Sequence, residues 1–466
     1  MTVGETVASS RSRPLDIPAP GPSVGVLGHV GTRNLGDEAI IEALIARIRL
    51  EWPGARIVAF SMDPADSARR HAVEAYPVRQ EGGRLDVASR AAEVADTLRA
   101  SKAIKPEVRP QPVARLLERI DAIVPKGRVR TALGTGLRRV AYLMTELGFL
   151  ARSFWRVRNL DAMIIAGSNQ FLDNFGGPWG YPYTLLKWVI LCRLAGCRAF
   201  CLSVGAGPLE DPLSHRLARL ALRLSNYASF RDHGSHALIA RIAAAPIGST
   251  APDLAHGLAW PATEAVVSSE RVTVAINPMP LYDARFWPVA DAERYRAFVR
   301  LLASFTQQVL RDGHRALFFT SHFADARVAL DVTDVLRQEA PDLADRLPPI
   351  HFPTTVTELM KVVSSANVVV ATRFHGILLS FLARRPVVGI CYHGKARELM
   401  RKYGQERYAV DIDQLDEGDL IARLRELAPR RALETDAIRE CNARLVAQLE
   451  AQYRVVFSEI ARRTSR

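Results

Sequence analysis

The chain has 466 residues, of which 48% are hydrophobic and 24% charged, the balance of a globular protein with two domains. Its formal net charge of +13 indicates anionic partners, but no basic stripe with interleaved aromatic residues is present, so we expect no nucleic acid. It has no apolar run of about 18 residues, no secretory signal and no disulfide or zinc pattern among its five cysteines. The sequence therefore predicts a cytoplasmic protein without a metal site.

The first half of the chain predicts a parallel-sheet domain. Residues 1–22 have no apolar pattern and are expected to be a disordered lead-in. After them, short apolar runs alternate with amphipathic stretches, and this alternation is typical of a parallel sheet flanked by helices. The expected strands are 23–28, 55–61, 160–167, 198–207 and 227–232, within a domain that spans 23–260.

Residues 80–158 do not fit the alternation and are expected to be a helical insertion. Segment 111–158 carries ten Lys or Arg residues and three Asp or Glu residues. It has two interpretations: a helix packed on the first domain with a solvated basic face, or a helix lying on an anionic bilayer at the inner face of the membrane. The second interpretation uses Arg138, Arg139, Arg152 and Arg156 beside Phe149, Phe154 and Trp155. We favour the packed helix.

The second half of the chain repeats the pattern. Residues 261–270 are expected to be a linker, and a second parallel-sheet domain is expected at 271–430. Its strands are predicted at 271–278, 315–321, 366–373 and 386–392, and a long C-terminal helix at 431–466 can cross back to the first domain. The carboxyl ends of the strands in both domains should face a shared cleft, where open α/β sheets bind ligands.

The loop "GHVGTRNLGDEA" at 28–39 joins the first strand to the first helix. Its three glycines allow a tight turn, but the spacing matches neither a P-loop nor a dinucleotide fingerprint. Asp37 and Glu38 either cap the helix or face a ligand. Because their charge would repel phosphate, we expect a hydroxyl-bearing acceptor at Asn34, Gly36, Asp37 and Glu38.

The segment "ATRFHG" at 371–376 places an arginine and a histidine where a buried strand gives way to a helix. Arg373 offers a rigid fork for a carboxylate or phosphate, and His375 offers a further donor or a proton. Helix amides at the same point attract anions. We therefore expect an anion site at Arg373 and His375.

Two more segments should open onto the same region. "GICYHGK" places Tyr392 and Lys395 after the next strand, and "YASFRDHGS" places Arg231 at the end of a strand in the first domain, with Asp232 as the helix cap. Arg231 should therefore face Arg373 across the cleft. The aromatic residues Tyr282, Phe286 and Trp287 form either a packed loop or a wall on which a sugar stacks.

These segments resemble the polysaccharide pyruvyl transferase family. The similarity lies in "GHVGTRNLGDEAI", in "SVGAGPL" with "YASFRDHGS", and in "ATRFHG" with "RRPVVGICYHGK", and it spans most of residues 24–404. The resemblance implies a GT-B-like fold of two Rossmann-like domains. It also implies transfer of the enolpyruvyl unit of phosphoenolpyruvate to sugar hydroxyls, with phosphate release, during exopolysaccharide or cell-surface polysaccharide synthesis.

The resemblance also assigns roles to residues. It implies that Arg231, Arg373 and His375 contact phosphoenolpyruvate, which serves as donor substrate, without a further cofactor. Lys395 and Tyr392 are expected beside them. For the chemistry we expect His375 and Arg373 to be catalytic and Asp37 to be the base, with Glu38 as the alternative base. The acceptor is a saccharide, either free or lipid-linked.

Two other functions fit the same architecture. A nucleotide-sugar glycosyltransferase would use an acidic residue on the ribose, and Asp325 or Glu358 could serve. A non-catalytic protein that binds polysaccharide or a membrane surface would release no phosphate from phosphoenolpyruvate. Both rest on analogy at the level of the fold.

Overall fold

The computed structural model describes residues 21–28, 31–80, 128–244, 247–260, 271–287 and 290–464, with side chains from residue 143 onward in the helix that begins at 128. The predicted linker 261–270, residues 81–127 of the predicted insertion and nearly all of the predicted lead-in lie outside the described residues. None of the described helices combines the length and apolar character that a membrane-crossing segment needs.

The N-terminal sheet is parallel throughout, in the order β3-β2-β1-β4-β6-β7-β8, with β5 paired to β6. Its strands are β1 (Ser23–Leu27), β2 (Arg56–Ser61), β3 (Glu74–Pro77), β4 (Ala162–Ala166), β5 (Asn169–Phe171), β6 (Arg198–Ala206), β7 (Tyr227–Phe230) and β8 (Ser249–Thr250). The five strands expected from the sequence are present. The three additional strands are short; β3 and β8 contain no buried residue, so the apolar pattern could not reveal them.

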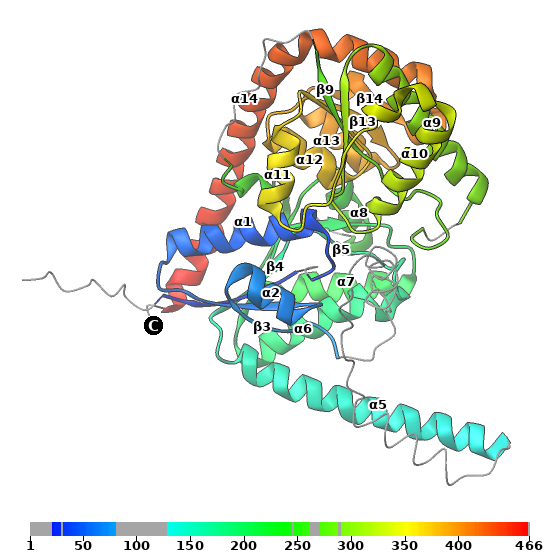
Figure 1. Ribbon diagram of the computed structural model, residues 1–466. Coiled ribbons are helices and arrows are strands. Elements are labelled where there is room, and N and C mark those ends of the chain that lie inside the picture. The colour runs from blue at the N-terminus through cyan, green and yellow to red at the C-terminus, as the bar shows by residue number, and fades with distance from the viewer. Residues whose placement is uncertain are drawn as a thin grey trace, which may run out of the picture.

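Helices cover both faces of this sheet. Alternate strand residues such as Val26 and Ile164 pack on one face against α1, and Phe60 and Ile165 pack on the other face with α5 and α6. The helices are α1 (Leu35–Glu51), α2 (Pro64–His71), α5 (Arg128–Val157), α6 (Tyr181–Ala195), α7 (Pro212–Leu224) and α8 (His233–Ala243). Figure 1 shows α5 along the outer edge of this domain.

The C-terminal sheet is also parallel, in the order β11-β10-β9-β12-β13-β14. Its strands are β9 (Thr273–Asn277), β10 (Arg315–Phe319), β11 (Ile350–His351), β12 (Val368–Ala371), β13 (Val387–Cys391) and β14 (Ala409–Asp411). The helices are α9 (Ala292–Arg311), α10 (Asp325–Glu339), α11 (Val356–Ser364), α12 (Phe374–Leu382) and α13 (Gly394–Lys402). Numbered within the domain, the order is the 3-2-1-4-5-6 of a doubly wound sheet. The predicted fold class, two Rossmann-like parallel-sheet domains, is confirmed.

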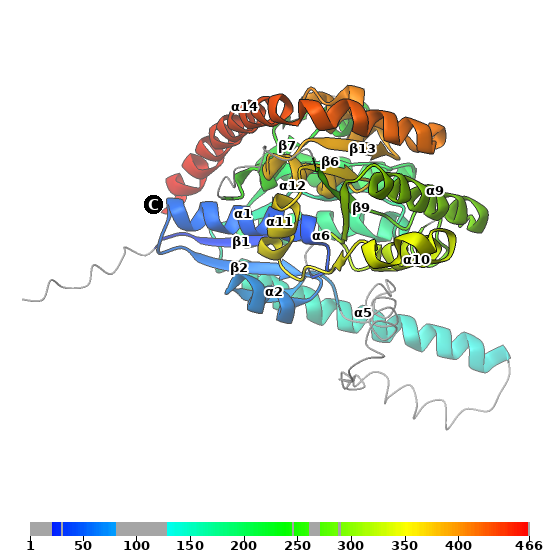
Figure 2. The same ribbon diagram turned by 45° about the horizontal axis from the view of Figure 1, so that its top comes forward.

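The last helix, α14 (Glu417–Thr464), connects the two domains from outside (Figures 1 and 2). It begins well before the expected 431 and continues through Pro429, a residue that usually ends or kinks a helix. Near its end, the Arg47 guanidinium donates to Glu450 at 3.0 Å, and Phe457 packs on Trp52 with ring centroids 4.7 Å apart. Short 3-10 segments complete the chain at Gly177–Trp179, Leu254–Gly257, Pro341–Arg346, Glu406–Tyr408 and Ile412–Gln414.

Candidate active site

Residues that follow strands of both sheets meet between the domains. Arg231 follows β7 of the first domain, and Arg373 and His375 flank Phe374 after β12 of the second. The guanidinium carbon of Arg231 lies 4.4 Å from the ring centre of Phe374. Arg231 Nη1 and His375 Nε2 lie 3.1 and 3.9 Å from the same oxygen of Asp253. The structure thus brings together the three residues that the sequence predicted as an anion site.

Asp253 joins this group, and sequence reasoning missed it. Its side chain is buried, and one oxygen accepts a hydrogen bond from the Ala255 amide at 3.0 Å, which caps a 3-10 turn. Burial tends to raise the pKa of Asp253, but the charge of Arg231, together with His375, outweighs this and holds the pKa below its ordinary value. The sequence around Asp253 indicates only a residue that caps a helical turn. Its contacts with Arg231 and His375 arise because the residues after β7 and β12 lie close to each other.

Arg373 is held by a second buried carboxylate. Its Nε donates to Oδ1 of Asp325 at 2.5 Å, and Oδ2 of Asp325 accepts the amides of Ser321 and His322 at 3.1 and 3.0 Å. Asp325 is fully buried. One edge of the Arg373 fork is therefore fixed, which orients its terminal nitrogens for another anion.

The two acidic residues considered for a ribose are engaged elsewhere. Asp325 holds Arg373 and the loop at Ser321. Glu358, on α11, accepts the Thr354 amide at 2.8 Å, and its own amide donates to Thr355 in a helix cap. Asp325 is therefore committed to Arg373 and the Ser321 loop, whereas Glu358 is an exposed residue in the first turn of α11.

His375 is enclosed by groups from both domains. Its Nε2 is buried without a hydrogen-bond partner among the described residues. Burial lowers the pKa of His375, although the charges of Asp253 and Asp37 act to raise it. Burial therefore favours the neutral imidazole, and the two carboxylates favour the charged one. It touches Gly36 of α1 so closely that a Cβ at position 36 would lie 2.2 Å from its Cγ.

The start of α1 brings the expected acceptor residues to the same place. Oδ1 of Asn34 accepts the Gly36 amide at 3.1 Å, and Nδ2 of Asn34 donates to Asp37 at 2.7 Å. Asp37 is buried, and its negative charge reaches His375. Asn34 therefore caps the helix while it orients Asp37 beside the imidazole.

Glu38 has a different environment. Its side chain is 1% exposed; Oε1 accepts the Gly31 amide at 3.0 Å, and Oε2 lies 2.9 Å from His71 Nε2. These contacts hold the glycine loop against α2. Of the two carboxylates considered as the base, Asp37 is the one whose charge acts on His375.

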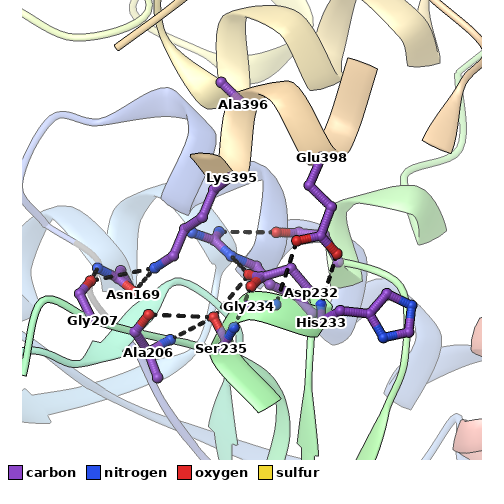
Figure 3. Close-up of polar contacts among 12 residues, drawn as sticks. Asn169, Ala206, Gly207, Asp232, His233, Gly234, Ser235, Lys395, Ala396 and Glu398 are labelled. Atoms are coloured by element: carbon purple, nitrogen blue, oxygen red, sulfur yellow. Dashed lines mark hydrogen bonds and ion pairs between the residues drawn. The ribbon is translucent and has the colours of Figure 1, made fainter. Parts of the chain in front are cut away.

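Lys395 and Glu398 of α13 reach into the first domain, as Figure 3 shows. Lys395 Nζ donates to Asn169 Oδ1 at 2.7 Å and to the Gly207 carbonyl at 3.3 Å. One turn later, Glu398 accepts the His233 and Gly234 amides at the start of α8, at 2.7 and 3.4 Å. The Asp232 side chain accepts the Ser235 amide of that helix, so its predicted role as cap is confirmed.

The position of Lys395 changes its acidity. Burial lowers the pKa of its ammonium group to about 7, and the nearby charge of Arg231 acts in the same direction. An anion beside Lys395 would favour its charged form. Lys395 thus connects the two domains, and near neutral pH its side chain is charged or neutral according to the charges beside it.

Tyr392 connects the charged residues to an aromatic group. Burial raises the pKa of its hydroxyl, and the charges of Arg373 and Arg231 oppose that shift. Its ring lies edge-on to Trp287 at 5.6 Å, and Trp287 lies edge-on to Tyr282 at 6.1 Å. Phe286 pairs instead with Phe323 at 6.0 Å. The aromatic residues considered as a sugar wall therefore border the site through Tyr392 and Trp287.

The two domains are in direct contact around these residues, where the sequence predicted a cleft. The Leu35 amide donates to the Ser321 carbonyl at 2.9 Å, and Asn34 and His322 form an antiparallel bridge. Lys402 also reaches the Arg231 carbonyl at 3.5 Å. The arrangement is closed. Within the described ranges, no group of three His, Cys, Asp or Glu side chains has a geometry that could hold a metal ion.

The architecture defines the class of protein: a two-domain GT-B fold. The structure of Anabaena HepE in complex with UDP is 12% identical, with a TM-score of 0.52, and the match covers 94% of this chain and all of that one. S. aureus MnaA with UDP is 8% identical, with a TM-score of 0.49, covering 93% of this chain and 97% of that one. E. coli ADP-heptose heptosyltransferase II is 12% identical, with a TM-score of 0.40, covering 88% and 99%. At 12% identity the likeness to HepE concerns the fold alone.

The family follows from a separate comparison. The family model for polysaccharide pyruvyl transferase matches residues 34–394, a span that includes Asn34, Arg231, Arg373 and His375. The chain belongs to this family and is therefore a transferase.

Proposed function

We propose that this protein transfers the enolpyruvyl unit of phosphoenolpyruvate to two hydroxyls of a saccharide as a cyclic ketal, during synthesis of exopolysaccharide or cell-surface polysaccharide. The observation that supports the proposal is the meeting of Arg231, Arg373 and His375 between two domains. Phosphoenolpyruvate carries about three negative charges in a small volume, and guanidinium forks match carboxylate and phosphate oxygens.

In this proposal the donor lies at the start of α12. The first amides of that helix attract an anion, and the side chain of the N-cap residue, Arg373, forms no hydrogen bond with them. The oriented edge of Arg373 binds one anionic group; Arg231 provides positive charge from the first domain, and Lys395 provides it from α13 of the second. No further cofactor is needed.

His375 supplies the proton in the proposed reaction. Protonation of C3 makes C2 electrophilic, and the first sugar hydroxyl forms a C–O bond to C2. The second hydroxyl then replaces phosphate at C2 and closes the ketal; its proton returns to His375, the proton from the first hydroxyl passes from Asp37 to the departing phosphate, and one inorganic phosphate leaves. Asp37, with its charge already acting on His375, accepts a hydroxyl proton. The saccharide, free or lipid-linked, lies toward Asp37 and Trp287.

The test is an assay with phosphoenolpyruvate and a panel of free and lipid-linked saccharides. We expect phosphate release together with a pyruvate ketal on one acceptor, identified by mass spectrometry and NMR. Calorimetric titrations with phosphoenolpyruvate and with UDP- and GDP-sugars run in parallel. Binding of a nucleotide sugar without binding of phosphoenolpyruvate would show a glycosyltransferase instead.

Asp37→Asn should abolish most turnover without preventing donor binding. An amide at this position still accepts from Asn34, so the helix cap remains, but it cannot take a proton. Loss of a general base lowers kcat by about 10²–10⁴-fold. The comparison is Glu38→Gln, which should mainly lower the melting temperature because Glu38 holds the glycine loop. Unchanged kcat in Asp37→Asn would remove Asp37 from the role of base.

Donor binding should take up protons near neutral pH. Burial keeps the pKa of His375 below its ordinary value, and a phosphate beside it would raise that pKa. The affinity should therefore increase as pH falls through the pKa of the bound state and level off below that of the free state. Calorimetry in two buffers of different ionisation enthalpy measures the uptake.

The variants separate the contributions to this uptake. His375→Gln should reduce it, and the remainder belongs to the substrate phosphate and to Lys395, whose pKa is about 7. His314→Gln, at the far end of β10, should change nothing. If His375→Gln takes up as many protons as the unmodified protein, then His375 does not gain charge on binding.

A further inference from the structure

Helix α5 presents an apolar stripe that no described element covers. Leu143 and Leu147 are each 58% exposed and Trp155 is 60% exposed, at positions one or two helical turns apart on one face. The opposite face packs on α6, where Phe149 is buried against Trp188 and Lys187 pairs with Glu146 at 3.0 Å. The aromatic residue that lies outward is therefore Trp155; Phe149, which the sequence also offered for membrane contact, is buried.

Basic side chains accompany the stripe. Arg158 is exposed within the stripe, and Arg152 is exposed at its edge beside Trp155; neither forms an ion pair with an acid in the described part of the chain. The guanidinium of Arg158 lies 5.2 Å from the ring centre of Trp155. The surface formed by Leu143, Leu147, Arg152, Trp155 and Arg158, here named the α5 face, is both apolar and cationic.

A cavity of about 340 Å³ adjoins the α5 face, between α5 and the strands β2 and β3. Arg156 lies over the ring of Tyr76 at 3.8 Å, and Arg56 pairs with Glu74 at 2.5 Å. Three arginines against one nearby carboxylate leave the cavity positive. Its polar and aromatic lining comes from Arg56, Tyr76, Arg152, Trp155, Arg156 and Asn159.

We propose that the α5 face docks on an anionic lipid bilayer, with its apolar stripe at the acyl boundary and the arginine-lined cavity around a lipid phosphate. A helix with exposed leucines and tryptophan on one face and arginines beside them has the composition of an interfacial helix. Charge complementarity selects the partner: residues 143–158, whose side chains the structure describes, carry three arginines and one acidic residue. Figure 1 shows α5 at the outer edge of the molecule, away from the interdomain site. The proposal does not depend on the proposed function.

The experiment is flotation of the full chain with phosphatidylcholine vesicles that contain or lack phosphatidylglycerol. We expect binding only with phosphatidylglycerol, weakening as salt is added. Arg152→Ala with Arg158→Ala should weaken binding about 25-fold, at about 5-fold for each charge. Leu147→Ser with Trp155→Ser should also weaken it strongly. The matched controls are Leu433→Ser, 60% exposed on α14, and Arg462→Ala, also exposed near the end of α14; both should bind normally.

Each other outcome overturns the proposal. Absence of binding to phosphatidylglycerol vesicles would show that the α5 face is not a membrane surface. Binding that both double variants retain would place the contact elsewhere on the protein. Sedimentation that reveals a dimer, lost in Leu147→Ser with Trp155→Ser and not accompanied by vesicle binding, would identify the α5 face as a contact between two copies of this chain.

Discussion

Replacing Gly36 with alanine is expected to lower kcat by about 10²-fold and to lower the melting temperature, because the added Cβ forces the domains out of contact. An alanine Cβ would lie 2.2 Å from Cγ and 2.3 Å from Cβ and Nδ1 of His375, closer than two carbon atoms can approach. The domains would have to separate or tilt, and a displacement of about 1 Å at reacting groups is enough for a loss of this size. Alanine is also a better helix former than glycine, so α1 itself should not suffer.

A matched control is available at the start of α13. A Cβ added to Gly394 meets nothing within 4 Å, and Gly394 opens its helix much as Gly36 opens α1. Gly394→Ala should therefore keep wild-type kcat. Small-angle scattering should show a larger radius of gyration for Gly36→Ala than for Gly394→Ala. Equal activity and equal dimensions in the two variants would mean that the closed arrangement is not needed for turnover.

Arg373→Lys should lower kcat/KM for the donor by about 10²–10³-fold. Lysine keeps a positive charge that can pair with the buried Asp325, but it lacks the second edge of the fork. Arg373→Ala would be harder to interpret, because an unpaired buried Asp325 destabilises a protein by about 3–5 kcal/mol. Steady-state kinetics with phosphoenolpyruvate, together with a thermal melt, measure the effect.

The control for this substitution is Arg327→Lys on α10. Arg327 forms an exposed pair with Asp331, one turn along the same helix, and pairs of that kind contribute little. Its kcat/KM should match the unmodified protein. If Arg373→Lys also matches it while the melting temperature is unchanged, then Arg373 serves the structure of the Asp325 loop rather than the donor.

The fold could be predicted because its buried strands are short apolar runs. "ANVVV" and "PVVGIC" form β12 and β13. A strand of a parallel sheet that helices cover on both faces is apolar at nearly every position, so such a strand is recognisable in the sequence. The same reasoning placed Arg231 and Arg373 at strand ends, and the carboxyl ends of parallel strands meet at one edge. The proximity of Arg231, Arg373 and His375 was therefore available from the sequence.

The carboxylates of the site were harder to predict. Asp253 has the sequence context of an ordinary helix cap, and its second role arises only because Arg231 and His375 approach it from different domains. Glu38 stands beside Asp37 in the sequence, yet one turns toward His71 and the other toward His375. The partners of these carboxylates depend on contacts between residues far apart in the sequence, so the local spacing of residues does not predict them.

Helix α14 restrains the two domains relative to each other. α14 is one continuous helix. It contacts Arg47 of α1 and Trp52 directly after α1, and it contacts the second domain through Asn442, whose side-chain oxygen accepts a hydrogen bond from the Tyr403 hydroxyl. Because one helix is bound to both domains, any change in their relative position must bend α14 or break one of these sets of contacts. α14 runs along one side of the molecule and contacts both domains there, so it restrains their relative position on that side (Figure 2).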